Sequence, residues 1–413
     1  MRALGAPPRG APSGAPSSAR VERAHGRCAS TTAAAAASTS SSSKTLVYCA
    51  SDLHVDYKEN EAWVRGLRER EASTSTSSTT SRSTSSSPTR VMCVAGDVSD
   101  DITAVERCLK EFQRRHDVVA YTFGNHELWL NKRDAEERGI EDSLAKIDAI
   151  LSMCASIGVV TSPTLVNDEI WVAPIHSYHH QSWDDEANVA ESVPPVEVIM
   201  NDFRFSNFRE LDASTEDVAR YCDALNDAGW DAFLDAVEPE HKIVSMSHFV
   251  PRIELIPEKR MLFYPRLPQA SGSVFLRARV EQLKARVNPG HIAHVFGHTH
   301  FGWSTELDGV RYIQAALATP KEWIKRPRSL QVGNFTNASD EPMCVYDGEA
   351  FAADDQRAMW SEYYRAHPRT PNNVELAPHA REFVRRRWGA HRRAMNAKDD
   401  PEAPLPGATG KVV

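Results

Sequence analysis

Short runs of strand-forming residues recur along the central part of the chain. Most of the runs are continuously apolar, with no polar residue at every second position. Strands that are covered on both faces have this pattern, so the runs predict buried strands at the centre of a layered α/β structure. The predicted strands comprise residues 45–50, 91–95, 118–123, 170–173, 243–246, 292–296 and 310–313.

Segments with a helical spacing of apolar residues separate these strands. Asp101 is a suitable N-cap, and the apolar residues after it share one helical face: Val105, Leu109 and Phe112. The same pattern predicts helices at residues 143–157, 216–236 and 273–287. Strands that alternate with helices predict one large α/β domain.

Five of the predicted strands stop at a His, Asp or Asn residue. In open α/β sheets the carboxyl ends of the strands form the edge where ligands bind, so we expect these residues to converge on one crevice. Glycines precede three of them and let the chain turn sharply and pass close to a bound group: Gly96, Gly124 and Gly297. The converging residues are Asp52, His54, Asp97, Asn125, His126, His248, His298 and His300.

Seven of these residues have the donor atoms that two metal ions need when one carboxylate is shared between the ions. A single buried His is usually held by ordinary hydrogen bonds, but a full set after successive strands indicates metal binding. Mixed nitrogen and oxygen donors favour Mn, Fe or Zn over Ca or Mg, with Mn as the expected ion. Two such ions lower the pKa of a bridging water enough to provide hydroxide, a nucleophile for phosphorus, near neutral pH.

The chain resembles the calcineurin-like metallophosphoesterase superfamily in five blocks that occur in the same order. The blocks are Asp52-Leu-His54, Gly96-Asp97, Gly124-Asn-His-Glu127, His248 and Gly297-His-Thr-His300. The resemblance covers residues 45 to about 320 and implies a four-layer α-β-β-α sandwich with two central mixed β-sheets flanked by helices. It also implies the ligands: Asp52, His54 and His300 for the first metal, Asn125, His248 and His298 for the second, and Asp97 as the bridge.

The resemblance gives His126 a role outside the metal ligands, as the proton donor to the departing alkoxide. An alkoxide is costly in a dry site, and a positioned imidazolium typically contributes about 10²- to 10⁴-fold to the rate. Asp100 matches the family position that orients this histidine. Glu127 is the less favoured alternative for that role.

The chain departs from two branches of the superfamily. Protein Ser/Thr phosphatases carry an Arg after the Gly-Asp block and another before Gly-Asn-His-Glu, where this chain has Asp101 and Phe123. Purple acid phosphatases have a Tyr ligand near the second block, where this chain has Val98-Ser99. We therefore expect an enzyme that hydrolyses a small-molecule phosphomonoester or phosphodiester. The alternative is a metal-binding scaffold of the same fold without catalysis.

The sequence is less informative about the substrate-binding loops. Residues 176–210 are rich in Trp, His, Phe and Arg and form the candidate substrate loop, in which Arg204 and Arg209 are candidates to meet a second phosphate. Histidines in loops are usually exposed, so surface positions are expected for His176, His179 and His180. His294 is expected in the core because it lies within a strand. Trp129 is expected to pack on the sheet, with stacking on substrate as the alternative.

Composition and charge limit the classes of partner and site that we expect. A net charge of -8 and a pI near 6.1 give no electrostatic reason to expect nucleic acid as a partner. The seven cysteines include no Cys-x-x-Cys pair, so we expect neither a disulfide framework nor a zinc-thiolate site. No apolar run reaches the roughly 18 residues that a membrane-spanning helix needs.

Low-complexity segments set the expected domain boundaries. Residues 1–43 are mostly small and polar, which predicts disorder, and their excess of Arg suggests a transit peptide. The expected compartment is then a plastid or mitochondrion, and otherwise the cytoplasm. The phosphoesterase domain is expected at 44–350 with a Ser/Thr-rich insertion at 73–88, followed by a helical extension and disordered tail at 351–413. The Arg-rich segment 381–393 predicts a solvated helix, with anion docking as the alternative.

Overall fold

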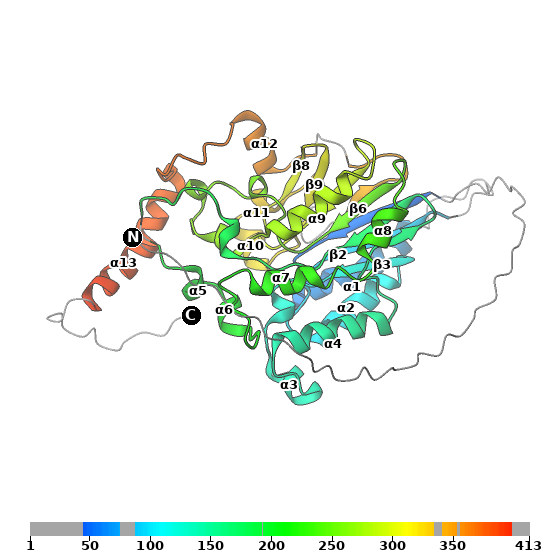
Figure 1. Cartoon of the computed structure of the whole chain (residues 1–413), viewed down its shortest axis with the longest axis horizontal. Helices are drawn as coiled ribbons and strands as arrows, with labels where there is room; N and C mark the ends of the chain where they lie inside the picture. The colour runs from blue at the N-terminus through cyan, green and yellow to red at the C-terminus, as the bar shows by residue number, and fades with distance from the viewer. Residues whose placement is uncertain (1–43, 75–86, 192, 334–340, 353–355, 399–413) are drawn as a thin grey trace, which may run out of the picture. The chain divides into compact units, whose positions relative to one another are not determined.

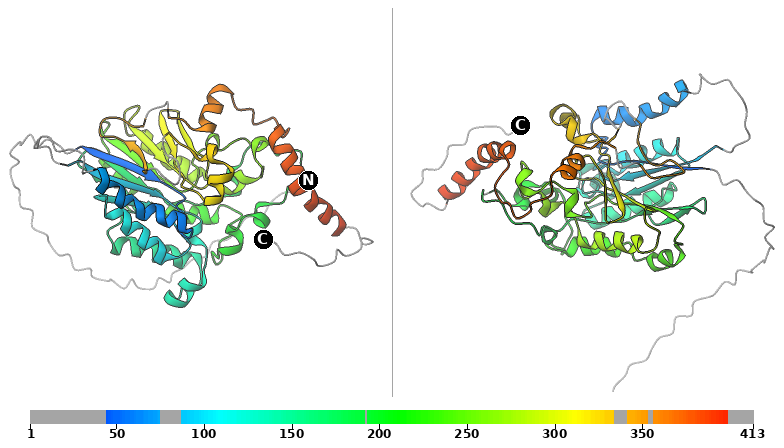
Figure 2. Two further views of the ribbon diagram at one scale, coloured as in Figure 1. Left: turned by 180° about the vertical axis from the view of Figure 1, so that it is seen from behind. Right: turned by 90° about the horizontal axis from the view of Figure 1, so that it is seen from above.

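Two β-sheets form the centre of the structure, a computed structural model that describes residues 44–74, 87–191, 193–333, 341–352 and 356–398. Helices flank the two sheets (Figures 1 and 2). The predicted α/β architecture with two mixed sheets between helical layers is thus confirmed. The predicted disorder and transit peptide at 1–43, most of the 73–88 insertion and the tail after 398 lie outside the described residues.

The first sheet carries three of the predicted strands side by side. Its order is β10-β1-β2-β3, in which β1, β2 and β3 are parallel and β10 is antiparallel to β1. Residues 91–95 of β2 are all fully buried, as the continuous apolar run predicts. The bounds are β1 Thr45–Ala50, β2 Thr89–Ala95, β3 Val118–Thr122 and β10 Met343–Tyr346.

The second sheet has the order β4-β5-β6-β7-β9-β8. Its four inner strands are parallel, and an antiparallel strand lies at each edge. All seven predicted strands are present, and the three that were not predicted (β4, β8 and β10) are antiparallel edge strands. The bounds are β4 Thr164–Val166, β5 Ile170–Pro174, β6 Lys242–Met246, β7 Ile292–Val295, β8 Trp303–Leu307 and β9 Val310–Gln314.

Helices cover the outer faces of both sheets (Figure 1). The predicted N-cap is confirmed, because the side chain of Asp101 accepts a hydrogen bond of 2.8 Å from the backbone N–H of Thr103. Next to the first sheet lie α1 Lys58–Thr74, α2 Ile102–Gln113 and α4 Ser143–Ser156. Next to the second lie α7 Asp217–Ala224, α8 Trp230–Ala236 and α9 Val274–Lys284.

The predicted single helix at 216–236 is wrong, because the segment forms two helices, α7 and α8. The break contains Asn226, whose buried amide donates to the carbonyl of His176 and accepts from its N–H, each at 2.8 Å. Gly229 then takes a left-handed conformation with φ of 83° before α8 begins. The break therefore fastens the loop that follows β5.

Shorter helices connect these layers. Helix α3 Lys132–Arg138 comes after strand β3. The candidate substrate loop contains α5 Val196–Ile199 and α6 Asp202–Phe205. After the second sheet come α10 Pro320–Lys325, α11 Pro327–Leu330 and α12 Met359–Ala366. Among the helices in the described ranges, none combines the length and apolarity that crossing a bilayer requires.

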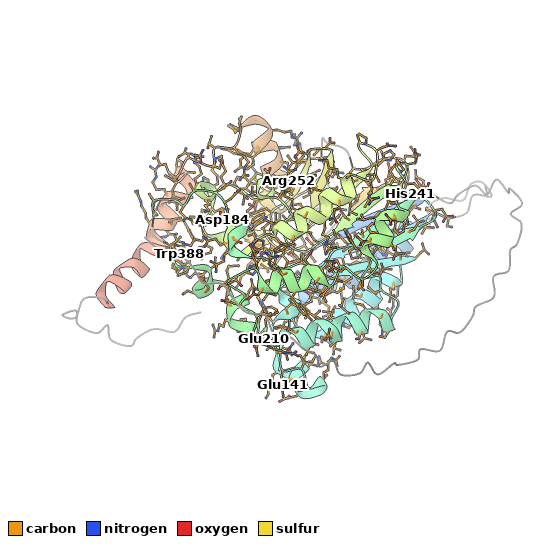
Figure 3. The ribbon with its side chains drawn as sticks, viewed as in Figure 1. Glu141, Asp184, Glu210, His241, Arg252 and Trp388 are labelled. Atoms are coloured by element: carbon orange, nitrogen blue, oxygen red, sulfur yellow. The ribbon has the colours of Figure 1, made fainter. Side chains whose placement is uncertain are left out.

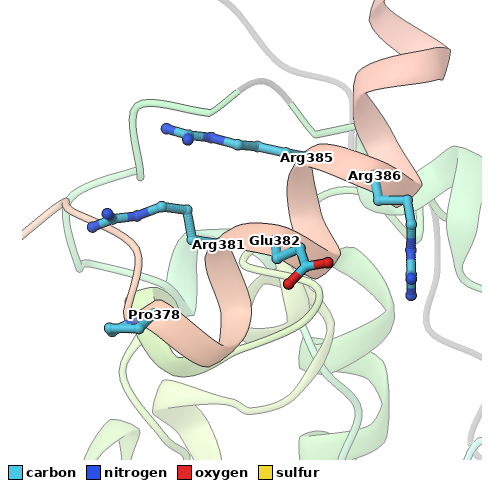
Figure 4. Close-up of a pocket in the computed structure, with 5 residues that line it drawn as sticks. All are labelled: Pro378, Arg381, Glu382, Arg385 and Arg386. Atoms are coloured by element: carbon cyan, nitrogen blue, oxygen red, sulfur yellow. The ribbon is translucent and has the colours of Figure 1, made fainter.

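The predicted Arg-rich helix is present as α13, Pro378–Lys398. Arg381 and Arg385 project from one side of α13 (Figure 4) and pair with Glu375 at 2.5 Å and Glu191 at 3.4 Å. These acidic partners favour the prediction of a solvated helix and not the alternative of an anion-docking surface. The domain boundary at residue 350 stays a prediction.

Trp388 helps to hold α13 against the rest of the described chain. Trp388 is 9% exposed and packs in a small cluster with Val384, and its indole N–H donates to the carbonyl of Phe263 at 3.0 Å (Figure 3). We expect Trp388→Ala to release α13, because removing a buried Trp side chain costs about 3 to 5 kcal/mol. Amide exchange in residues 378–388 should become about 100-fold faster, whereas exchange in β2 should not change.

Arg386→Ala is the matched control for this experiment, because Arg386 is an exposed residue of the same helix. It should leave exchange in α13 within a factor of a few of the wild type. Equal protection of α13 in wild type and Trp388→Ala would show that other contacts hold the helix.

Candidate metal centre

The predicted ligands come together at the carboxyl ends of the parallel strands. Strands β1, β2 and β3 are neighbours in one sheet and β6 and β7 in the other, so the residues that follow them meet between the sheets. The donor atoms of one group all lie within 4.8 Å of one another: Asp52, His54, Asp97 and His300. A second group contains Asn125, His248 and His298.

Five of the seven predicted ligands have a left-handed backbone. The φ angles are 52° for Asp52, 41° for His54, 53° for Asp97, 75° for His298 and 51° for His300. Residues other than glycine adopt this conformation at a cost, and it persists where surrounding structure imposes it. The sharp turns bring these side chains close together, and the clustering of strained residues indicates a functional site.

In the first group, nitrogen and oxygen atoms crowd around the imidazole of His300. Its Nε2 lies 3.0 Å from Nε2 of His54 and 3.3 Å from Oδ1 of Asp52. Its Nδ1 donates to the carboxylate of Glu322 at 2.8 Å. Burial lowers the pKa of His300, but Glu322 and Asp52 outweigh that effect and raise it to about 10. The group therefore holds a positive charge, which a proton or a metal ion can supply.

In the second group, three acceptor atoms face one another. Oδ1 of Asn125 lies 3.0 Å from Nε2 of His248 and 2.9 Å from Nδ1 of His298, and these nitrogens are 3.3 Å apart. The other ring nitrogen of each histidine donates to a backbone carbonyl, that of Ala95 at 3.0 Å and that of Ala270 at 2.6 Å. Each nitrogen that faces Asn125 therefore presents a lone pair.

Asp97 lies between the two groups. It belongs to the first group, and its Oδ1 is also 3.4 Å from Nε2 of His248 in the second group. The same oxygen accepts the backbone N–H of His126 at 3.0 Å. This position suits a carboxylate that bridges two ions.

The electrostatics of the site fit bound cations. Burial, and then the carboxylates of Glu127 and Asp52, raise the pKa of Asp97 well above its usual range. Burial and neighbouring histidines lower the pKa of His54 and of His298 to about 3, so both imidazoles are neutral and ready to bind a metal. Divalent cations stabilise crowded carboxylates and facing lone pairs alike, so the residues present fit a dinuclear centre.

The comparisons with known proteins agree with this geometry. The calcineurin-like phosphoesterase family matches the chain over residues 45–302. The chain belongs to this family. It is 26% identical over 260 residues to "[Acyl-carrier-protein] phosphodiesterase PptH" of Mycobacterium tuberculosis (strain ATCC 25618 / H37Rv). The aligned region covers 58% of this chain and 72% of that protein.

A solved structure is similar in fold to this phosphoesterase chain. The crystal structure of phosphopantetheinyl hydrolase (PptH) from Mycobacterium tuberculosis aligns with a TM-score of 0.50 and 22% sequence identity. The alignment covers 70% of this chain and 95% of that chain. The predicted family and fold are confirmed. The roles of individual site residues stay predictions.

Glu127 of the family motif braces the loops that carry the ligands. Its fully buried carboxylate accepts three backbone N–H groups, from Asp97 at 3.0 Å, Val98 at 2.6 Å and Gly124 at 2.6 Å. It thereby fastens the ends of β2 and β3 to each other. These contacts are with the backbone and not with the imidazole of His126.

His126 lies at the accessible edge of the site, with 25% of its side chain exposed. Its Nε2 is 3.8 Å from Oδ2 of Asp97, and the ring of Trp129 lies against it at a centroid distance of 3.6 Å. Both predictions for Trp129, packing on the sheet and stacking on a substrate, stay predictions. The described hydrogen bonds of Asp100 use its backbone carbonyl, which accepts from Asn131 and Lys146, so its orienting role stays a prediction.

Two carboxylates near the ligands were not predicted. Glu322 of α10 accepts from His300, and Asp202 of α6 accepts from the amide of Asn125 at 2.7 Å. Thr319 and Glu322 form a capping box, a sequence signature that predicts the start of a helix. Asp202 belongs to no comparable signature.

The candidate substrate loop is more buried than expected. The surface positions predicted for its histidines are wrong, because His176, His179 and His180 are exposed by at most 4%. Asn226 binds the backbone of the loop at His176, and the rings of Tyr178 and Phe249 lie against His179. His294 is confirmed as a core residue between the hydroxyls of Ser245 and Ser247.

The two loop arginines differ in their surroundings. Arg209 pairs with Asp142 at 2.9 Å, so its charge is already matched. Arg204 is exposed and lies over the ring of Phe205 at 5.1 Å. Arg204 is therefore the better placed of the two to meet an anionic group of a substrate.

A glycine next to the second group permits its close packing. A Cβ atom at Gly96 would lie 2.6 Å from Nδ1 of His248 and 2.8 Å from the backbone nitrogen of Gly124. We expect Gly96→Ala to displace His248 and to weaken binding of the second metal by about 10- to 100-fold, as is typical when groups that orient a ligand are disturbed. Metal content by mass spectrometry after dialysis measures the loss.

Gly158→Ala is a matched control, because Gly158 also has a left-handed backbone, with φ of 73° against 75° for Gly96, but no atom lies within 4 Å of its Cβ position. This variant has the same backbone strain without the collision, so it should retain both metals. Two metals per chain in Gly96→Ala would contradict the placement of His248.

Proposed function

We propose that this phosphoesterase hydrolyses a phosphodiester in a metal-dependent reaction. The observation that carries the proposal is the meeting of three acceptor atoms of Asn125, His248 and His298 beside the carboxylate of Asp97. Family membership supports phosphate ester chemistry, and the name of the PptH relative supports a diester. A phosphopantetheinyl carrier protein is therefore the first natural substrate to test, beside the small-molecule esters.

The ligands divide into two sets around a shared carboxylate. We assign Asp52, His54 and His300 to the first ion and Asn125, His248 and His298 to the second, with Asp97 between them and Mn as the proposed ion. Two divalent ions there supply charge that neutralises phosphoryl oxygens and lowers the pKa of water. The protein holds the donor atoms in place through the hydrogen bonds to Glu322, Ala95 and Ala270.

His126 is the proposed proton donor to the leaving oxygen. It follows the ligand Asn125 directly, and the bond from its backbone N–H to Asp97 fixes its position. Burial, together with His54, lowers the pKa of His126 well below its usual value, so the imidazole is neutral in the free protein. An anionic ester beside the ring favours the protonated form, which couples substrate binding to readiness of the acid.

An aromatic surface extends from His126 toward solvent. Trp129 lies against His126, and Phe205 lies 5.5 Å from Trp129 with 37% of its surface exposed. The guanidinium of Arg204 lies over the ring of Phe205. We propose that this row binds the leaving-group side of the ester through apolar contact and one positive charge.

The test compares hydrolysis of bis(4-nitrophenyl) phosphate, 4-nitrophenyl phosphate and phenyl esters by wild type and His126→Ala with Mn supplied. We expect two metals per chain in both proteins and a preference for the diester. Turnover of the phenyl diester should fall by about 10²- to 10⁴-fold in His126→Ala, because phenolate leaves poorly without a proton. The loss on the 4-nitrophenyl diester should be smaller.

His116→Ala is the control, since His116 is a buried histidine that bonds to the carbonyl of Phe112 away from the ligands. It should keep the wild-type rate. Less than about one metal per chain, or no His126-dependent activity on either type of ester, would overturn the proposed hydrolase function and favour a metal-binding scaffold.

A further inference from the structure

Asp202 touches both the second group of ligands and the support of the proton donor. We infer that Asp202 is a positioning residue that couples the second metal site to His126, through Asn125 on one side and Trp129 on the other. The inference rests on the proposed function and adds a residue to it that lies outside the five motif blocks.

One oxygen of the carboxylate makes both contacts. Oδ1 of Asp202 accepts from the side-chain amide of Asn125 at 2.7 Å and from the indole N–H of Trp129 at 2.8 Å. The other oxygen lies 3.4 Å from Nε2 of His179. Asp202 is 1% exposed, so water does not replace these partners.

The first contact decides which way the amide of Asn125 points. If the amide rotated by 180°, its NH₂ group would donate to the lone pairs of His248 and His298 and leave no ligand oxygen there. Its oxygen would then face the carboxylate of Asp202, and two acceptors would meet. Asp202 therefore keeps the oxygen of Asn125 toward the metal site.

The second contact holds the indole that supports His126. Lys146 donates to the backbone carbonyl of Trp129 at 2.5 Å, which fixes the main chain, and Asp202 fixes the ring. The indole then lies against the imidazole at 3.6 Å with an angle of 31° between the planes. Without Asp202 the indole N–H loses its hydrogen-bond acceptor, and the imidazole of His126 then packs against a ring that is no longer fixed in place.

The carboxylate is suited to this task because one of its oxygens accepts two N–H groups at once. An ionised carboxylate accepts both N–H groups more strongly than a neutral group does. His179 is itself fully buried against Tyr178 and Phe249, so water does not reach the contact between His179 and Asp202.

The experiment compares Asp202→Ala and Asp202→Asn with wild type in two measurements. Calorimetric titration with Mn gives the affinity of the second ion, and a series of aryl methyl phosphate diesters from 4-nitrophenol to phenol gives the dependence on the leaving group. We expect Asp202→Ala to bind the second ion 10- to 100-fold more weakly. It should also lose about tenfold more activity on the phenyl than on the 4-nitrophenyl diester. Asp202→Asn should recover most of both losses, since its carbonyl can accept both N–H groups.

Asp184→Ala is the matched control. Asp184 lies in the same loop (Figure 3), its side chain is also 1% exposed, and it pairs with Lys259 at 2.7 Å away from the ligands. Asp184→Ala should lower the melting temperature without changing the Mn affinity or the leaving-group dependence. Trp129→Phe keeps the contact of Asp202 with Asn125 but replaces the indole and its N–H by a smaller ring, so it should change the leaving-group dependence and not the Mn affinity.

The outcomes separate this inference from the proposed function. If wild type binds two Mn ions and hydrolyses diesters but Asp202→Ala changes only one measurement or neither, Asp202 does not couple the two sites. Equal impairment of Asp202→Asn and Asp202→Ala would also overturn positioning by these hydrogen bonds. If wild type hydrolyses no ester, the proposed function fails, and the Mn titration still decides whether Asp202 orients Asn125.

Discussion

Three acceptor atoms that face one another at about 3 Å are the constraint on which the site depends. Lone pairs of Asn125, His248 and His298 meet without a proton between them, and such a meeting is favourable only around a cation. The surrounding structure holds the atoms there despite their repulsion. A left-handed turn at His298 aims its side chain, and the backbone carbonyls of Ala95 and Ala270 accept from the remaining ring nitrogens of His248 and His298.

The fold provides this arrangement by bringing two sheets together at one edge. Strands β1, β2 and β3 lead to four of the predicted ligands from one sheet, and β6 and β7 lead to the other three from the second sheet. Glu127 ties β2 to β3 by accepting three backbone N–H groups. Two carboxylates from later in the chain complete the support, Glu322 beside the first group and Asp202 beside the second.

Much of this arrangement is predictable from the sequence because its causes are local. Residues 91–95 are buried on both faces of a sheet, so every position is apolar and the strand is recognisable. The predicted ligands come shortly after such strands, so their positions along the sheet edge follow from the positions of the strands. Strand β4 has one buried residue among its three, so it is too short and too exposed to show the continuous apolar run that marks the inner strands.

The supporting contacts were not predictable because they join segments that are distant along the chain. Asp202 meets Asn125 across 77 residues from a helix of four residues, and no pattern marks it. Glu322 carries a helix-start signature, but the signature does not indicate the contact with His300. His179 follows a polar loop pattern that usually means exposure, yet the packing of Tyr178 and Phe249 buries it.

Anomalous diffraction from crystals grown with Mn tests the central claim most directly. We expect two peaks separated by roughly 3.5 to 4 Å, the spacing typical of two-metal sites. One should lie among Asp52, His54 and His300 and the other among Asn125, His248 and His298, with Asp97 touching both. Crystals with no peak in the second group, and with the amide of Asn125 turned so that its nitrogen faces His248, would contradict a dinuclear centre.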